Sequence, residues 1–176
     1  LSTNLNPDLA WTDAPTGTIV IVKDAIPDNA QDFAFATTGT GLVAFSLDDD
    51  ADATLPNTRT FTGLEPGSYT VTEGAIAGWS LTGLSCSDPD SGTATDLVNR
   101  IATIDIDSGE TVTCTYTNSK RAVLRLQKAL PLGRFVAADQ FTLQIAGSGA
   151  PAPVTTTGSG TTATGTVSLD PATAGT

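Results

Sequence analysis

The chain has 176 residues, a formal net charge of -11 and a pI near 4.1, and it contains no His, no Met and two Cys. The lack of His excludes Ser-His-Asp and Cys-His catalytic sites and imidazole metal ligands. The acidic charge disfavours nucleic acid and anionic membrane surfaces as partners, and no apolar run reaches the roughly 20 residues of a membrane helix.

Apolar and polar residues alternate with a period of two along most of the chain, between clusters of Gly, Pro, Asn and Asp. This period is typical of β-strands, and no stretch shows the helical period of 3.6. Eight short strands within about a hundred residues predict an all-β fold, an antiparallel, immunoglobulin-like β-sandwich. The predicted strands are 18–23, 32–37, 43–47, 58–62, 68–73, 79–85, 101–106 and 111–118.

A second copy of this pattern begins shortly after Asn118. The later segments VLRLQKALP, DQFTLQIAG and VSLDPATAGT match the earlier segments TIVIVKDAIP, QDFAFATTG and FTGLEPGSYT, which aligns Lys128 with Lys23. We therefore predict a connector over 1–16, a sandwich over 17–120 and the first half of a second, similar sandwich over 121–176. Residues 158–165, inside the Thr-rich stretch 155–166, are predicted to be a flexible hairpin or linker. The incomplete second repeat indicates either a fragment of a longer protein or a domain completed by strands from a neighbouring chain.

Three polar residues are predicted to point into the first sandwich. In 68–73 the residues Ser68, Thr70 and Thr72 form a polar face, which turns Glu73 inward, and the alternate threonines of 111–118 turn Asn118 inward in the same way. Both faces of 18–23 are apolar, so the direction of Lys23 stays ambiguous.

These three residues would be costly to bury singly, so we expect them to meet. Burial would lower the pKa of Lys23 and raise that of Glu73, which produces a neutral amine beside a protonated carboxyl. Such an amine can attack the Asn118 carboxamide while the carboxyl polarises the amide and shuttles protons. The product would be an amide between Lys23 and Asn118, with ammonia released.

The segments GTIVIVK, GLEPGSYTVTEGAIAGW and VTCTYTNSK resemble the signature segments of Cna-B-type, or prealbumin-like, repeats of bacterial surface adhesins and pilins. The resemblance covers 17–120 and the front half of a further unit. It implies an intramolecular isopeptide bond between Lys23 and Asn118, promoted by Glu73. The sequence departs from the family in AIAGW, where a Pro and a GY pair are common, and in its two Cys.

Each of the three residues also has an ordinary interpretation. Lys23 could extend its stem along the sheet and hold its ammonium in water. Glu73 could open the following loop, and Asn118 could be a turn residue. Lys128 is the equivalent lysine of the second repeat, but its Glu and Asn partners would lie beyond Thr176.

The two cysteines are Cys86, at the end of the strand that begins at Trp79, and Cys114, which is predicted to point into the core. In an acidic, Thr-rich, exported domain they most simply form one disulfide. The alternatives are two buried free thiols or, with no His to activate it, a catalytic thiol.

Three acidic residues, Asp48, Asp50 and Asp52, stand at alternate positions in LDDDADA, as in a calcium loop. The Gly and Glu that complete an EF-hand are missing, and acidic loop residues are commonly solvated turn formers. Ca²⁺ is therefore the one cofactor that we consider.

These features predict a structural stalk or filament module of a bacterial extracellular, cell-surface protein. Its expected partners are neighbouring domains, copies of the same protein and a host or matrix ligand. One alternative is an adhesin or carbohydrate-binding module that uses acidic, Ca²⁺-binding loops. Another is a filament subunit completed by strand donation. Catalysis on external substrates is not expected, since the only predicted reaction is the autocatalytic cross-link.

Overall fold

The computed structural model describes residues 15–129, 136, 138–144, 152–155 and 162–169. Within them the chain forms strands and no helix, as the alternating sequence pattern predicted. The first repeat contains β1 (Gly17–Ile26), β2 (Asn29–Thr38), β3 (Phe45–Asp49), β4 (Thr58–Leu64), β5 (Gly67–Glu73), β6 (Trp79–Ser87), β7 (Ala94–Asp96), β8 (Ile101–Ile106) and β9 (Thr111–Lys120).

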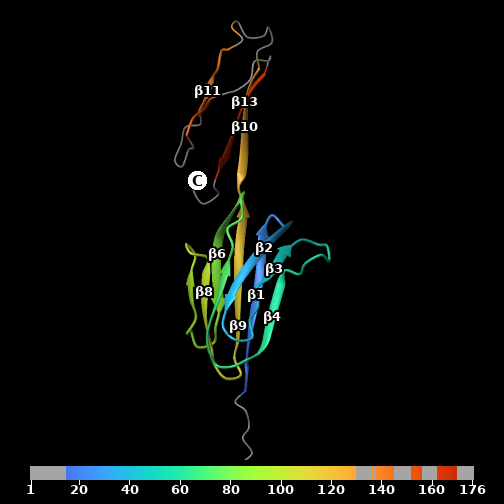
Figure 1. Cartoon of the computed structure of the whole chain (residues 1–176), viewed down its shortest axis with the longest axis vertical. Helices are drawn as coiled ribbons and strands as arrows, with labels where there is room; N and C mark the ends of the chain where they lie inside the picture. The colour runs from blue at the N-terminus through green and yellow to red at the C-terminus, as the bar shows by residue number, and fades with distance from the viewer. Residues whose placement is uncertain (1–14, 130–135, 137, 145–151, 156–161, 170–176) are drawn as a thin grey trace, which may run out of the picture.

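These nine strands form two sheets that pack face to face (Figure 1). One sheet has the order β4-β1-β9-β6 and the other the order β3-β2-β5-β8-β7. All neighbouring strands are antiparallel except β1 and β9, which are parallel. The prediction of a sandwich is confirmed, but the first and last strands of the repeat run in the same direction, side by side.

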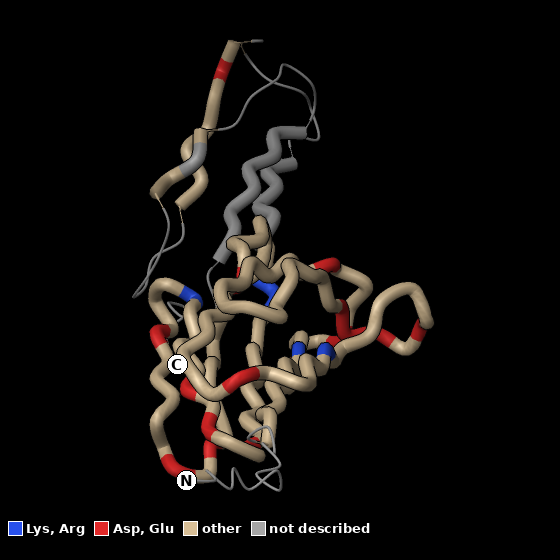
Figure 2. The backbone as a smooth tube through the Cα atoms, turned by 60° about the horizontal axis from the view of Figure 1, so that its bottom comes forward, with Lys and Arg blue, Asp and Glu red and all other residues tan. Residues whose placement is uncertain are grey.

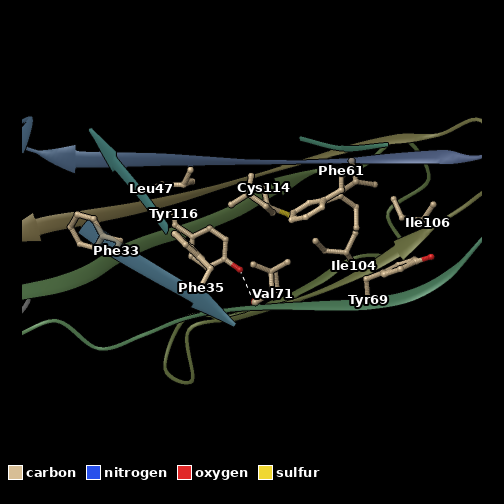
Figure 3. Close-up of a cluster of buried hydrophobic side chains, with 14 of the residues drawn as sticks. Phe33, Phe35, Leu47, Phe61, Tyr69, Val71, Ile104, Ile106, Cys114 and Tyr116 are labelled. Carbon is tan, nitrogen blue, oxygen red and sulfur yellow. Dashed lines mark hydrogen bonds between the residues drawn. The ribbon is translucent and has the colours of Figure 1, made fainter. Parts of the chain in front are cut away.

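The core lies between the sheets and is built from alternate residues of each strand. In β8, for example, Ala102, Ile104 and Ile106 are fully buried, whereas Thr103 and Asp105 are exposed. Aromatic side chains fill the centre, where the rings of Phe35 and Tyr116 meet edge to face with centroids 5.2 Å apart. The Tyr116 hydroxyl donates a hydrogen bond to the Val71 carbonyl across the core at 2.7 Å (Figure 3). This bond ties β9 to β5 in the facing sheet.

The second repeat contributes β10 (Ala122–Ala129), β11 (Thr142–Leu143), β12 (Val154–Thr155) and β13 (Thr162–Leu169). β10 pairs with β13 antiparallel, which repeats the pairing of β1 with β4 in the first unit. Only Arg121 separates β9 from β10. Its backbone N–H donates to the Gly78 carbonyl at 2.8 Å, so the junction is hydrogen-bonded to the first sandwich.

The sequence-based prediction places the start of one strand too early and misses another strand. The strand predicted over 43–47 begins at Phe45, and Val43 is exposed. β7 was not predicted because all three of its residues are exposed and show no alternation. Residues 162–165 of the segment predicted to be a flexible hairpin or linker belong to β13, and 158–161 lie outside the described residues. The predicted connector over 1–16 lies almost wholly outside the described residues.

Core packing predicts a large difference between two aliphatic truncations, one in β8 and one in the turn between β7 and β8. Ile104→Ala removes a fully buried side chain of β8, and we expect the free energy of unfolding to fall by about 2–5 kcal/mol. Val98→Ala, at a position that is 85% exposed, should change it by less than about 0.5 kcal/mol. Urea unfolding followed by Trp fluorescence measures both, and equal effects of the two substitutions would contradict the packing described here.

Candidate cross-linking site

Lys23 points into the sandwich because it continues the buried face of β1. Ile19, Ile21 and Ala25 share this face and are buried, and Lys23 itself is 1% exposed. The neighbouring strand β9 runs parallel, with Lys23 in register with Tyr116. The next inward residue along β9 is Asn118, which is 3% exposed. A long side chain directed along the strands can therefore reach Asn118.

The Lys23 amine contacts Asn118 directly. Its Nζ lies 2.8 Å from the Asn118 Oδ1 and 2.9 Å from the Tyr116 carbonyl oxygen, both across the β1–β9 pair. It also donates to the Asp24 carbonyl at 3.0 Å and lies 4.1 Å from the centre of the Phe33 ring. The amine is thus held in a fixed position within the core.

Glu73 reaches the same point from the facing sheet, at the end of β5. Its Oε2 accepts a hydrogen bond from the Asn118 Nδ2 at 3.0 Å, and its Oε1 lies 3.7 Å from the Lys23 Nζ. Glu73 is 1% exposed, and Oε1 has no hydrogen-bond partner among the described residues. The carboxyl therefore lies beside both nitrogen atoms, that of the amine and that of the amide.

Burial shifts both ionisable groups toward their neutral forms. Desolvation lowers the pKa of Lys23 from 10.5 to about 8, although the nearby Glu73 charge opposes the shift. Desolvation also raises the pKa of Glu73, opposed by Lys23 and by the Asn118 hydrogen bond. A neutral amine and a protonated carboxyl avoid much of the cost of two charges in a dry interior.

Glu73 and Lys23 contact opposite ends of the Asn118 amide group. The carboxyl of Glu73 bonds to the amide nitrogen of Asn118, while the amide oxygen faces the lysine. A carboxyl between the two nitrogen atoms can exchange protons with both, as the proton-shuttle role predicted for Glu73 requires.

Arg100 supports Glu73 and was not expected from the sequence. The Glu73 N–H donates to the Arg100 carbonyl at 3.0 Å, and the Arg100 Nε donates to the Glu73 carbonyl at 3.2 Å. The Arg100 backbone has a φ of 61°, in the left-handed region that is uncommon for a residue with a side chain. The alternation of polar and apolar residues carries no signal for such a turn.

Cys86 on β6 and Cys114 on β9 form a disulfide between directly opposed residues. Strand β9 is thus linked covalently to β6 on one side and contacts the Lys23 amine of β1 on the other. Lys128 lies on β10, where its backbone is in register with Ala163. Asp48, Asp50 and Asp52 come together at the end of β3, each with one carboxylate oxygen within 4.8 Å of the others.

Two family models match the sequence of this chain. A model described as a prealbumin-like fold domain matches residues 19–120, and a second model with the same description matches 123–176. The chain therefore belongs to the family of prealbumin-like fold domains. No curated protein matches it, and the described residues form no helix that could cross a membrane.

Solved structures of several bacterial proteins are similar to this chain at low sequence identity. An adhesin from Mobiluncus mulieris with intramolecular disulfide, isopeptide and ester bond cross-links is 18% identical, with a TM-score of 0.44, over 59% of this chain and 41% of the adhesin chain. A streptococcal ancillary pilin is 18% identical, with a TM-score of 0.40, over 90% of this chain and 52% of the pilin. The Bacillus anthracis TIE protein is 17% identical, with a TM-score of 0.42, over 88% of this chain and 26% of the TIE chain. The chain thus spans about two fifths of the adhesin's length.

The disulfide predicts a measurable loss of stability when both cysteines are replaced. The bond joins residues 28 positions apart, and closing such a loop contributes roughly 3–4 kcal/mol by restricting the unfolded chain. We expect Cys86→Ser/Cys114→Ala to lower the free energy of unfolding by about that amount in urea. Ser87→Ala, at an exposed position of the same strand, is the control, and a double variant as stable as this control would contradict the expectation.

Proposed function

We propose that this chain is a structural stalk or filament module of a bacterial extracellular, cell-surface protein, and that its first sandwich carries an isopeptide bond between Lys23 and Asn118. The observation that carries the proposal is the buried contact of the Lys23 amine with the Asn118 amide at 2.8 Å, with Glu73 beside both nitrogens. Membership of the prealbumin-like family and the resemblance to repeats of surface adhesins and pilins support the same function.

The reaction needs only groups that the sandwich holds together. The neutral Lys23 amine attacks the Asn118 carboxamide carbon, and a C–N bond forms. Glu73 accepts the proton that the amine loses and gives a proton to the amide nitrogen, so the carbon–nitrogen bond of Asn118 breaks and ammonia leaves. Glu73 ends in the protonation state in which it began. A pocket of about 360 Å³ is lined in part by Glu73 and Asn118, and in this proposal ammonia leaves through it.

The bond would suit a module that bears load. Lys23 and Asn118 are 95 positions apart, so the amide closes a loop that removes roughly 4–5 kcal/mol of unfolded-state freedom. It joins β1 to β9, which are the first and last strands of the repeat and adjacent in one sheet. Tension applied at the two ends of the repeat would pass through this bond without unfolding the strands between.

Intact mass tests the bond and the disulfide together. Under non-reducing, denaturing conditions we expect the chain to be lighter than its sequence mass by one ammonia and two hydrogens. Three variants should be lighter than their sequence mass by the two hydrogens only: Lys23→Ala, Glu73→Gln and Asn118→Ala. They remove, in that order, the nucleophile, the proton carrier and the electrophile. Retention of the disulfide in these variants reports that the sandwich has folded.

A matched control uses another lysine of the same domain. Lys120 lies at the exposed end of β9, so Lys120→Ala should still lose one ammonia. A wild-type mass short of two hydrogens only would refute the isopeptide bond while leaving the fold intact.

The lowered pKa of Lys23 predicts a pH dependence in a variant that keeps the amine free. Burial lowers the pKa of Lys23 in the folded wild-type chain from 10.5 to about 8, and we expect Asn118→Ala to keep the lowered pKa, so that between these values the unfolded chain binds more protons. Stability should therefore rise as pH increases through this window, by on the order of 2 kcal/mol. Urea unfolding at a series of pH values measures it. In Lys23→Met/Asn118→Ala the rise should be absent, and identical profiles of the two variants would contradict a buried amine.

A further inference from the structure

A second cluster of polar groups lies at the end of β3, where Asp48, Asp50 and Asp52 alternate. One carboxylate oxygen from each lies within 4.8 Å of the other two. The loop from β3 to β4 projects from the side of the sandwich (Figure 1), and acidic positions follow one another along it (Figure 2). Like charges this close repel one another, so the cluster is unfavourable without a compensating cation.

Asp48 is the unusual member because it is buried. It is 1% exposed, and its Oδ1 has no hydrogen-bond partner among the described residues. The same residues provide no ion pair to it, since the ion pair found among them joins Lys23 and Glu73. A carboxylate oxygen that is removed from water and left unpaired costs free energy that an ordinary solvated turn residue does not incur.

The other oxygen of Asp48 is only partly satisfied. The Thr54 hydroxyl lies 3.3 Å from the Asp48 Oδ2 and 2.7 Å from the Asp52 Oδ1. A hydroxyl has one proton to donate, so it cannot fully satisfy both carboxylates. Thr54 thus adds a fourth oxygen to a group that contains more acceptors than donors.

A second acidic cluster in the same sandwich lacks a buried, unpaired carboxylate oxygen. Asp88, Asp90 and Glu110 also gather, but none of them is buried. The Asp88 carboxylate there accepts hydrogen bonds from the backbone N–H groups of Ser91 and Thr93 at 3.1 and 2.7 Å. That cluster has no buried orphan oxygen and serves as an internal control.

We propose that Asp48, Asp50 and Asp52, with Thr54 beside them, form a Ca²⁺ site at the β3–β4 loop. All four side chains offer oxygen, the donor atom that Ca²⁺ prefers. Ca²⁺ accepts six to eight oxygens in flexible geometry, so a loop and water can supply the rest, whereas Mg²⁺ demands a near-ideal octahedron. A bound cation would also stabilise the buried Asp48 carboxylate in its ionised form.

Calorimetric titration of the full chain, stripped of metal with EDTA and desalted, tests the site. We expect CaCl₂ to give one saturable binding event that Asp48→Asn and Asp50→Asn each abolish and that Asp90→Asn, in the control cluster, leaves unchanged. Absence of saturable binding, binding unchanged by Asp48→Asn, or binding equally strong with MgCl₂ would overturn the proposal.

Thermal unfolding supplies a second measurement, which also covers a variant that folds poorly. At a hundredfold excess over its dissociation constant, Ca²⁺ should raise the Tm of the wild-type sandwich by about 10 °C. In EDTA, Asp48→Asn should melt no lower than wild type, because a neutral amide is less costly to bury than a lone carboxylate. A marked loss of stability of this variant in EDTA would contradict the account of Asp48, and a wild-type Tm insensitive to Ca²⁺ would contradict the site.

Discussion

The central constraint in this protein is a lysine amine enclosed in the dry interior of a β-sandwich. An ammonium ion buried beside an aromatic ring and a carboxyl is expensive unless it is neutralised or paired closely. Here the Glu73 oxygen that faces the amine is 3.7 Å away and otherwise unpaired. Burial lowers the pKa of Lys23 and so raises the fraction of neutral amine, and a neutral amine 2.8 Å from a carboxamide oxygen is a nucleophile next to its electrophile. The cost of burial and the proposed chemistry thus have one cause.

The parallel pairing of β1 with β9 makes this contact available. Because both strands run in the same direction, the inward residues of β9 continue past the register partner of Lys23 to Asn118. On its other side β9 pairs with β6, where the disulfide lies. Strand β9 is therefore joined to β6 by the disulfide and to β1 by the proposed amide. Only Arg121 separates it from β10. In the proposed stalk function, such a strand would transmit force from one repeat to the next.

The sequence predicts most of the fold and the inward direction of two site residues, because alternating threonines mark the solvent side of β5 and β9. It leaves Lys23 undecided, since both faces of β1 are apolar and only the opposite sheet determines which one is covered. The period-two pattern shows which residues face inward but not in which direction neighbouring strands run. The parallel pairing of β1 with β9 could therefore not be predicted from the sequence pattern. The burial of Asp48 could not be predicted either, because it depends on the register of β3. The contact of Arg100 with Glu73 depends on a left-handed turn that the sequence pattern does not show.

Peptide mapping tests the central claim most directly. Trypsin does not cleave at a lysine whose amine is acylated, so after reduction and alkylation the digest should contain a branched peptide in which residues 1–59 are joined to 101–120. Fragmentation should place the branch at Lys23 and Asn118, with one ammonia missing. Cleavage after Lys23, together with a linear peptide 101–120 of full mass, would contradict the account.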